Sequence, residues 1–177
     1  MKYKLAAIAA IAAVATLQPG QSQAAITGQI QASLIIAAGC QVTNGSAVSG
    51  NINDFGTLDF GTAASTWTNA LSAQVSGAGA SGTLQVTCDS SIKSFSVAID
   101  RGLHGNRALK HATLADTVNY DVFQDVARSS AYGNNTPVTF PSSGTPVDVP
   151  IYGAIAPNGT SVQSGTYTDT LTVTLTF

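Results

Sequence analysis

The twelve residues that close the chain, "TYTDTLTVTLTF" at positions 166–177, decide its fold. A threonine stands at every second position from Thr166 to Thr176, and the residues between include Leu171, Val173 and Leu175. Alternation with a period of two predicts a β-strand with one apolar face and one polar face. No turn and no returning strand follow Phe177, so we ask what covers the far edge of this strand.

This strand lacks the features that protect free edges in monomeric proteins. Such edges carry lysine, proline or a bulge, which prevent another chain from pairing with them. Residues 171–177 contain no lysine and no proline, and a long uncharged strand of this kind is prone to aggregate when it is left bare. We therefore expect a second polypeptide strand to cover it.

The first 24 residues are predicted to be a secretory signal peptide. Two lysines precede an uncharged, alanine-rich run at 5–17, and the small residues of "SQA" at 22–24 supply a cleavage site. The run is too short to be a membrane span. Removing 24 of the 177 residues leaves 153, which is enough for one domain with its own core.

Composition favours strands over helices and excludes nucleic acid as a partner. Without Lys2 and Lys4, five of the seven basic residues remain against nine aspartates, a net charge of −4, and there is no glutamate. A nucleic-acid-binding face needs a denser set of basic side chains. Threonine, serine, glycine, valine and alanine dominate, whereas strong helix formers are scarce. The sequence therefore predicts an exported all-β domain.

Cys40 and Cys88 are the only cysteines. In an oxidising compartment an isolated pair of this kind is expected to form a disulfide. Closing a loop of 48 residues contributes about 4 kcal/mol in the chain-entropy account. There is no CxxC spacing and there are only two histidines, His104 and His111, so the chain offers no tetrahedral metal set. We predict a structural disulfide, no metal and no cofactor.

Several short strands are predicted ahead of the terminal one. Apolar residues alternate at 84–88, 95–99, 118–122 and 147–151, and these stretches are bounded by Gly, Asn, Ser or Pro. Many short strands with such turns are typical of a β-sandwich or barrel. The stretch 44–54 is predicted to be a loop. The stretch 100–116, which holds both histidines, is predicted to be a solvated connection or a short helix.

No arrangement typical of an enzyme occurs. The chain lacks a G-x-S-x-G elbow, an H-E-x-x-H motif and a glycine-rich phosphate loop. Asp59 and Asp169 stand beside strand residues, where we expect each carboxylate to accept a hydrogen bond in a turn or ladder. We therefore predict no catalytic residues.

A second unpaired strand is predicted in residues 25–37. Its even positions carry Ile26, Gly28, Ile30, Ala32, Leu34 and Ile36. The odd positions begin polar and turn apolar at Ile35, which predicts burial on one face and then on both.

These segments follow one another in the order seen in a known family. Cys40 is followed by "FGTLDFG" (55–61), "LQVTC" (84–88), "FSVAIDRG" (95–102), "NYDVFQD" (119–125), "IYGAIAPN" (151–158) and "GTYTDTLTVTLTF" (165–177). The chain resembles the spore coat protein U-like pilins of archaic chaperone–usher pili, most closely the main subunits of Csu-type pili. The resemblance covers everything after the signal peptide. It departs at Tyr132, near which the family often has a tryptophan.

The resemblance implies an incomplete immunoglobulin-like β-sandwich of six strands, whose missing final strand is supplied by donor-strand complementation. Residues 25–37 would donate a strand to a neighbour, and residues 38–177 would form the pilin domain. The acceptor groove would be lined by Leu171, Val173, Leu175 and Phe177.

The resemblance also implies the partners of the chain. A periplasmic chaperone would fill the groove first, and the next subunit would replace it at the outer-membrane usher. The homopolymer would join tip or minor pilins in a surface pilus (fimbrium) that mediates attachment and biofilm formation.

Two alternatives use the same strands differently. An eight-stranded outer-membrane β-barrel also ends on an alternating strand, but it needs aromatic girdles and repeated ten-residue spans. The eleven aromatic residues after position 24 and the short predicted strands fit it poorly. A self-complemented monomeric adhesin or coat protein would fold residues 26–36 back into its own groove, which the short link from Ile36 to Cys40 makes harder. We expect the polymer subunit.

Overall fold

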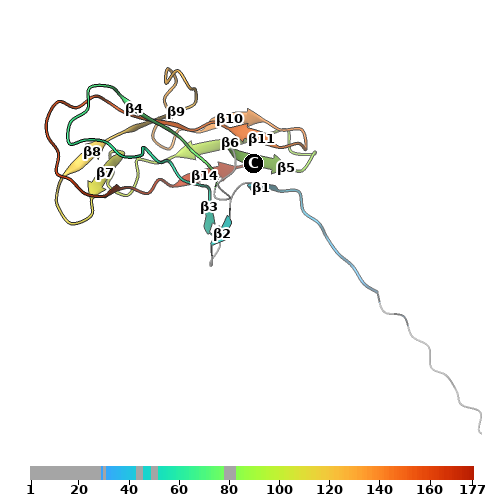
Figure 1. Cartoon of the computed structure of the whole chain (residues 1–177). Helices are drawn as coiled ribbons and strands as arrows, with labels where there is room; N and C mark the ends of the chain where they lie inside the picture. Colours follow the sequence, from blue (N-terminus) through green and yellow to red (C-terminus); the bar gives the residue numbers. More distant parts are fainter. Residues whose placement is uncertain (1–28, 30, 43–45, 49–51, 78–82) are drawn as a thin grey trace, which may run out of the picture. The chain divides into compact units, whose positions relative to one another are not determined.

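The computed structural model describes residues 29, 31–42, 46–48, 52–77 and 83–177 (Figure 1). The predicted signal peptide and the donor positions Ile26, Gly28 and Ile30 lie outside these residues. The chain divides into two units, Met1–Ile35 and Ile36–Phe177. In the first unit, the described residues belong to no strand, and those at 29 and 31–35 are exposed.

In the described part of the second unit, the regular secondary structure is all β-strand, and there is no helix. The fourteen segments are β1 (Cys40–Val42), β2 (Ser46–Val48), β3 (Ile52–Asp54), β4 (Leu71–Gln74), β5 (Leu84–Cys88), β6 (Ser94–Ile99), β7 (Ala108–His111), β8 (Thr117–Asn119), β9 (Asp121–Phe123), β10 (Val138–Pro141), β11 (Val147–Val149), β12 (Tyr152–Ile155), β13 (Tyr167–Thr168) and β14 (Val173–Thr176). No helix long and apolar enough to span a membrane occurs in the residues described. The prediction of an all-β chain is confirmed, although the long strands appear as shorter segments.

The strands form four three-stranded sheets and one separate hairpin, β2–β3, and all their pairings are antiparallel. Sheets β1–β5–β11 and β4–β12–β9 adjoin because only Pro150 and Ile151 separate β11 from β12. Sheets β10–β6–β14 and β13–β7–β8 adjoin along the terminal segment that holds β13 and β14. The sheets therefore make two layers.

Buried side chains from both layers form one core. The buried positions are those that the alternation predicted, namely Leu84, Val86 and Cys88 in β5 and Phe95, Val97 and Ile99 in β6. The same cluster includes Val149 and Ile151 from the first layer. Because the two layers share this core, the domain is a β-sandwich.

Among the described strands, the chain passes between the two layers five times, and two of these crossings follow β8 and β10. β8 pairs with β7, whereas β9, which follows the buried Tyr120, pairs with β12. β10 pairs with β6, whereas β11 pairs with β5. The strand predicted over 118–122 is divided by the crossing after β8. The strand predicted over 147–151 ends at Pro150, which has no N–H for a ladder.

Two stretches that the sequence predicted as loops contain strands. Residues 44–54 include β2 and β3, and residues 100–116 include β7, which pairs with β8 and β13. The prediction of a connection or short helix is therefore wrong at Ala108–His111. β7 buries Ala108 and His111, which are three residues apart, so its burial lacks the period of two that marks a strand.

Candidate functional site: the outer edge of the terminal strand

The predicted terminal strand forms two segments in the structure. β13 pairs with β7 through Tyr167 opposite His111, and β14 pairs with β6 through Val173 opposite Ile99. β14 lies at the end of its sheet beside β6 (Figure 1), and no described strand pairs with its other side. This outer edge of β14 is the candidate site.

One hydrogen bond fixes which peptide groups of β14 face outward. The Asp100 N–H donates to the Thr172 carbonyl (3.1 Å), so the peptide groups of Thr172 face β6. Hydrogen-bonded and non-hydrogen-bonded pairs alternate along an antiparallel ladder, so the groups of Thr174 also face β6. The N–H and C=O groups of Val173 and Leu175 therefore point away from β6. Both residues offer a donor and an acceptor to an added strand.

The residues with outward-facing peptide groups also carry apolar side chains. Leu171, Val173 and Leu175 are partly buried and pack against the core, whereas the threonines between them are exposed. Phe177 is 60% exposed. The structure thus brings three of the predicted acceptor residues onto the core and leaves Phe177 largely in solvent.

Asp169 holds the chain where the terminal strand is interrupted. Its Oδ2 accepts a hydrogen bond from the Tyr120 hydroxyl (2.8 Å), and its Oδ1 accepts one from the Leu103 N–H (2.9 Å). Burial, and next the bond to Asp169, raise the pKa of Tyr120, which therefore stays protonated as the donor. The carboxylate approaches Gly102 so closely that a Cβ there would collide with it, and Gly102 has a φ of +78°. Asp169 accepts hydrogen bonds as predicted, but its partners Tyr120 and Leu103 are distant in sequence, so these bonds belong to neither a local turn nor a strand ladder.

Asp100 fixes the start of β14. Its Oδ1 accepts hydrogen bonds from the N–H groups of Gly102 and Thr172, both at 2.9 Å. Burial alone would raise the pKa of Asp100, but the hydrogen bonds from Thr172 and Gly102 outweigh it and hold the pKa below its usual value. The ionised carboxylate of Asp100, the residue after β6, therefore holds Thr172, the residue before β14. Asp59, by contrast, accepts a bond from the Gly61 N–H (2.8 Å) in a local turn, as predicted.

His111 is a packing residue beside β13. Its Nε2 lies 3.2 Å from the Ser164 carbonyl, and its ring meets Tyr167 edge-on with centroids 5.0 Å apart. A Cβ at Gly165 would collide with this ring. The G-x-Y-x-D pattern at 165–169 therefore combines a close approach, a ring contact and a carboxylate anchor. In the part of the chain that the structure describes, no three His, Cys, Asp or Glu side chains are grouped for a metal ion.

The predicted disulfide between Cys40 and Cys88 is confirmed. The two residues lie directly opposite each other in β1 and β5, with Cα atoms 3.9 Å apart. The Asp89 N–H donates to the Gly39 carbonyl (2.9 Å), which extends the pairing by one residue. Only Ala38 and Gly39 separate the predicted donor segment from this covalent link.

Three of the six predicted donor residues are among those described. Ala32 is exposed, and the side chains of Leu34 and Ile36 are 83% and 85% exposed. Ile35, between them, is 92% exposed. A run of large aliphatic side chains in water is unfavourable by roughly 1.5–3 kcal/mol each relative to full burial.

Comparison with known proteins assigns the chain to a family. The family model described as Spore Coat Protein U domain matches residues 26–174. The chain belongs to the spore coat protein U domain family. Protein U of Myxococcus xanthus, a relative, is 31% identical over 189 residues, which cover 100% of this chain and 98% of Protein U. The family resemblance drawn from the sequence is therefore confirmed.

The chain is also similar to a chain in a solved structure. It is the CsuC–CsuE chaperone–tip adhesion subunit pre-assembly complex from archaic chaperone–usher Csu pili of Acinetobacter baumannii. The two chains share 16% identity with a TM-score of 0.48, over 80% of this chain. The spore coat protein U domain chain covers 40% of the length of that chain.

Sequence reasoning missed three residues that shape the edge in this spore coat protein U domain: Asp100, Tyr120 and Leu103. Asp100 carried a usable signal, because an aspartate two residues before a glycine is typical of a turn closed by the side chain. Tyr120 and Leu103 carried none, since their partner Asp169 is 49 and 66 positions away, respectively.

Proposed function

We propose that this chain is a structural, non-enzymatic pilin, the major subunit of an archaic chaperone–usher pilus. It polymerises by donor-strand exchange at the outer edge of β14. The observation that carries the proposal is the orientation of Val173 and Leu175, whose peptide groups face away from β6 while their side chains rest on the core. An extended peptide that adds to such an edge gains main-chain hydrogen bonds and buries alternate side chains.

Residues 25–37 supply the added strand. The four large aliphatic side chains at the even positions, Ile26, Ile30, Leu34 and Ile36, would each contribute roughly 1.5–3 kcal/mol on burial, or about 6–12 kcal/mol together. The exposure of Leu34 and Ile36 supports this role, because each side chain has most of its surface left to bury.

The positions of the two segments lead to a fibre. The donor strand precedes the domain in sequence, and the acceptor edge lies at the other end of the chain. A donor on one copy that fills an acceptor on the next forms a head-to-tail contact, and contacts of this kind propagate as a filament when they do not close into a ring.

The outer edge of β14 would also be the surface that the assembly partners bind. A chaperone in the periplasm would cover β14 before assembly, and an outer-membrane usher would exchange it for the next subunit. Tip or minor pilins would complete the surface pilus, which acts in attachment and biofilm formation. Family membership and the resemblance in the sequence support these assignments.

Two substitutions at adjacent positions test the donor segment. Ile30→Asp places a charge on the face that we assign to the acceptor core, where an unpaired buried charge is costly, so it should abolish fibres. Gln29→Asp introduces the same charge on the opposite face of the strand and should leave assembly intact. Fibres are scored by electron microscopy of material sheared from the cell surface.

Deletion of residues 25–32 separates the polymer from the self-complemented monomer. The deletion should abolish fibres and leave binding to the chaperone intact, because the chaperone binds the acceptor edge. Fibres formed by the deleted chain would contradict the donor assignment. A deletion that leaves secretion as a monomer but strongly destabilises that monomer would instead support a segment that folds back on its own domain.

A further inference from the structure

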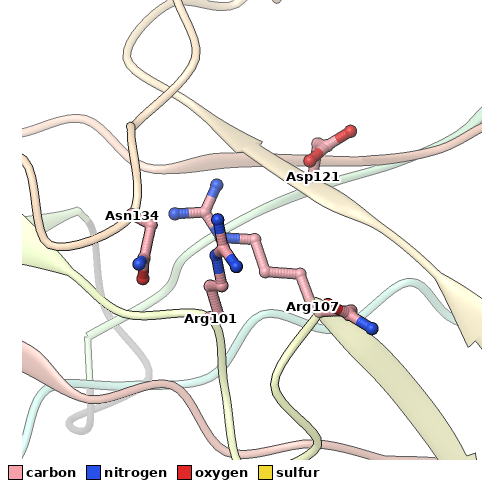
Figure 2. A pocket seen from close by; sticks show the side chains of 5 residues that line it. Arg101, Arg107, Asp121 and Asn134 are labelled. Carbon is pink, nitrogen blue, oxygen red and sulfur yellow. The ribbon is translucent and has the colours of Figure 1, made fainter.

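A polar pocket of about 210 Å³ lies beyond the end of β6 (Figure 2). It is open to solvent and is lined by Arg101, Asn106, Arg107, Asp121 and Asn134. In Figure 2 the guanidinium groups of Arg101 and Arg107 reach into the same space, with Asn134 and Asp121 on either side. The pocket is smaller than the roughly 300–1,000 Å³ that encloses drug-sized ligands, so it fits one small ring or ion.

The two arginines are not alike. Arg107 is 7% exposed and has a φ of +52°, and its guanidinium donates to the carbonyls of Asp100 (3.2 Å), Tyr132 (2.7 Å) and Ile99 (3.5 Å). A guanidinium has five N–H donors, so these three bonds leave two N–H groups of the pocket-lining Arg107 side chain without a hydrogen bond among the described residues. The exposed Arg101 has no hydrogen-bond or ion-pair partner among the described side chains.

The charges in the pocket do not cancel. Burial lowers the pKa of Arg107, and Arg101 lowers it further, whereas Asp121, Tyr120 and Asp100 oppose that change. Both guanidinium groups stay charged at neutral pH. Against the single carboxylate of Asp121 they leave the lining with one net positive charge. The carboxylate of Asp100 lies outside the lining and is occupied by the N–H groups of Gly102 and Thr172.

We propose that this pocket binds a carboxylate-bearing sugar, such as a uronic acid unit of an acidic polysaccharide. The sugar carboxylate pairs with Arg101 and the free N–H groups of Arg107, since guanidinium groups bind carboxylates through paired hydrogen bonds. One net positive charge matches one carboxylate. The Asp121 carboxylate accepts hydrogen bonds from the hydroxyl groups of the ring, and the amides of Asn106 and Asn134 can both donate and accept. A simple anion would leave these three groups without a role.

Calorimetric titration of the purified full-length protein tests the site with three probes: trigalacturonate, galactose and acetate. We expect saturable binding of trigalacturonate, no measurable binding of galactose and weak binding of acetate. Arg101→Gln should weaken trigalacturonate binding about tenfold or more, because it removes a charge-assisted pair. Lys93 precedes β6, at the end of the strand away from the pocket. Lys93→Gln also removes one positive charge and should leave trigalacturonate binding unchanged. Arg101 makes no side-chain bond in the described structure, so its loss should not affect folding.

A second variant distinguishes a sugar site from a general anion site. Asp121→Asn removes the negative charge from the lining, so acetate should bind more tightly, while trigalacturonate should lose its advantage over acetate. Absence of saturable binding would overturn the proposal. The proposal would also be overturned if trigalacturonate and acetate bound with equal affinity per carboxylate. It would be overturned as well if Arg101→Gln and Lys93→Gln lost the same amount of trigalacturonate affinity.

Discussion

Replacing Val173 by proline removes one backbone N–H from the outer edge of β14 and leaves the hydrogen bonds to β6 in place. The Asp100–Thr172 hydrogen bond shows which peptide groups face β6. Those of Thr172 and Thr174 point toward β6, and those of Val173 point outward. Proline is tolerated in an edge strand where its missing N–H faces solvent. Val173→Pro should therefore fold normally but pair poorly with an incoming strand.

The size of the effect follows from the lost bond. A backbone hydrogen bond contributes about 0.5–1.5 kcal/mol net, and a buried carbonyl left without a donor costs about 1–3 kcal/mol. The donor strand would be buried, so its carbonyl opposite Val173 would be left without a donor, at a cost of about 1–3 kcal/mol. We expect the contact between subunits to weaken by about 1–3 kcal/mol, or about 5- to 150-fold.

Thr174→Pro is the matched control one position along the strand. It removes a hydrogen bond to Ala98 of β6 and leaves the outer edge unchanged, so it should destabilise the domain itself. Urea unfolding of the subunit in complex with its chaperone measures the fold, and the urea concentration at which fibres release subunits measures the contact. If Val173→Pro fibres resist urea like wild type while the domain is destabilised, the outward orientation of Val173 is wrong.

Three further predictions concern the anchors of the edge. Asp169→Ala and Tyr120→Phe should show a coupling of about 1.5–3 kcal/mol in a double-mutant cycle measured by urea unfolding, because the hydrogen bond joins a hydroxyl to a charged acceptor; additive effects would contradict this bond. Since the folded state lowers the pKa of Asp100, its stabilisation is present above the unfolded value near pH 4 and is lost as the pH falls through the folded value. Asp100→Asn should therefore lower stability at pH 6 more than at pH 2, and equal loss at both pH values would contradict the linkage. Replacing both cysteines by serine should cost about 2–5 kcal/mol of unfolding free energy, and an unchanged urea midpoint would contradict a stabilising role for the disulfide.

The sequence predicted the core strands well because their burial has a simple period. β5 and β6 each bury every second residue, and that alternation is visible without any partner. The interruption of the terminal strand was not predictable in this way. It depends on Asp100 and Tyr120, which lie 72 and 49 positions from the residues that they bind.

The stretch 100–116 shows a different limit. Arginine is rarely buried, so a segment with Arg101, Arg107 and Lys110 is predicted to lie in solvent. Arg107 is nevertheless buried, because three backbone carbonyls accept its N–H groups. Those carbonyls come from Ile99, Asp100 and Tyr132, and only the folded sandwich brings them together.

The cross-strand disulfide has a mechanical consequence for a fibre built as we propose. Tension carried along a donor segment would enter each domain at Cys40, in β1. This strand has three residues, so without the disulfide its hydrogen bonds could break one after another. The bond to Cys88 passes the pull to β5, which has neighbours on both sides. Reduced fibres should consequently yield at lower force in single-molecule stretching, since the load would then rest on β1 alone.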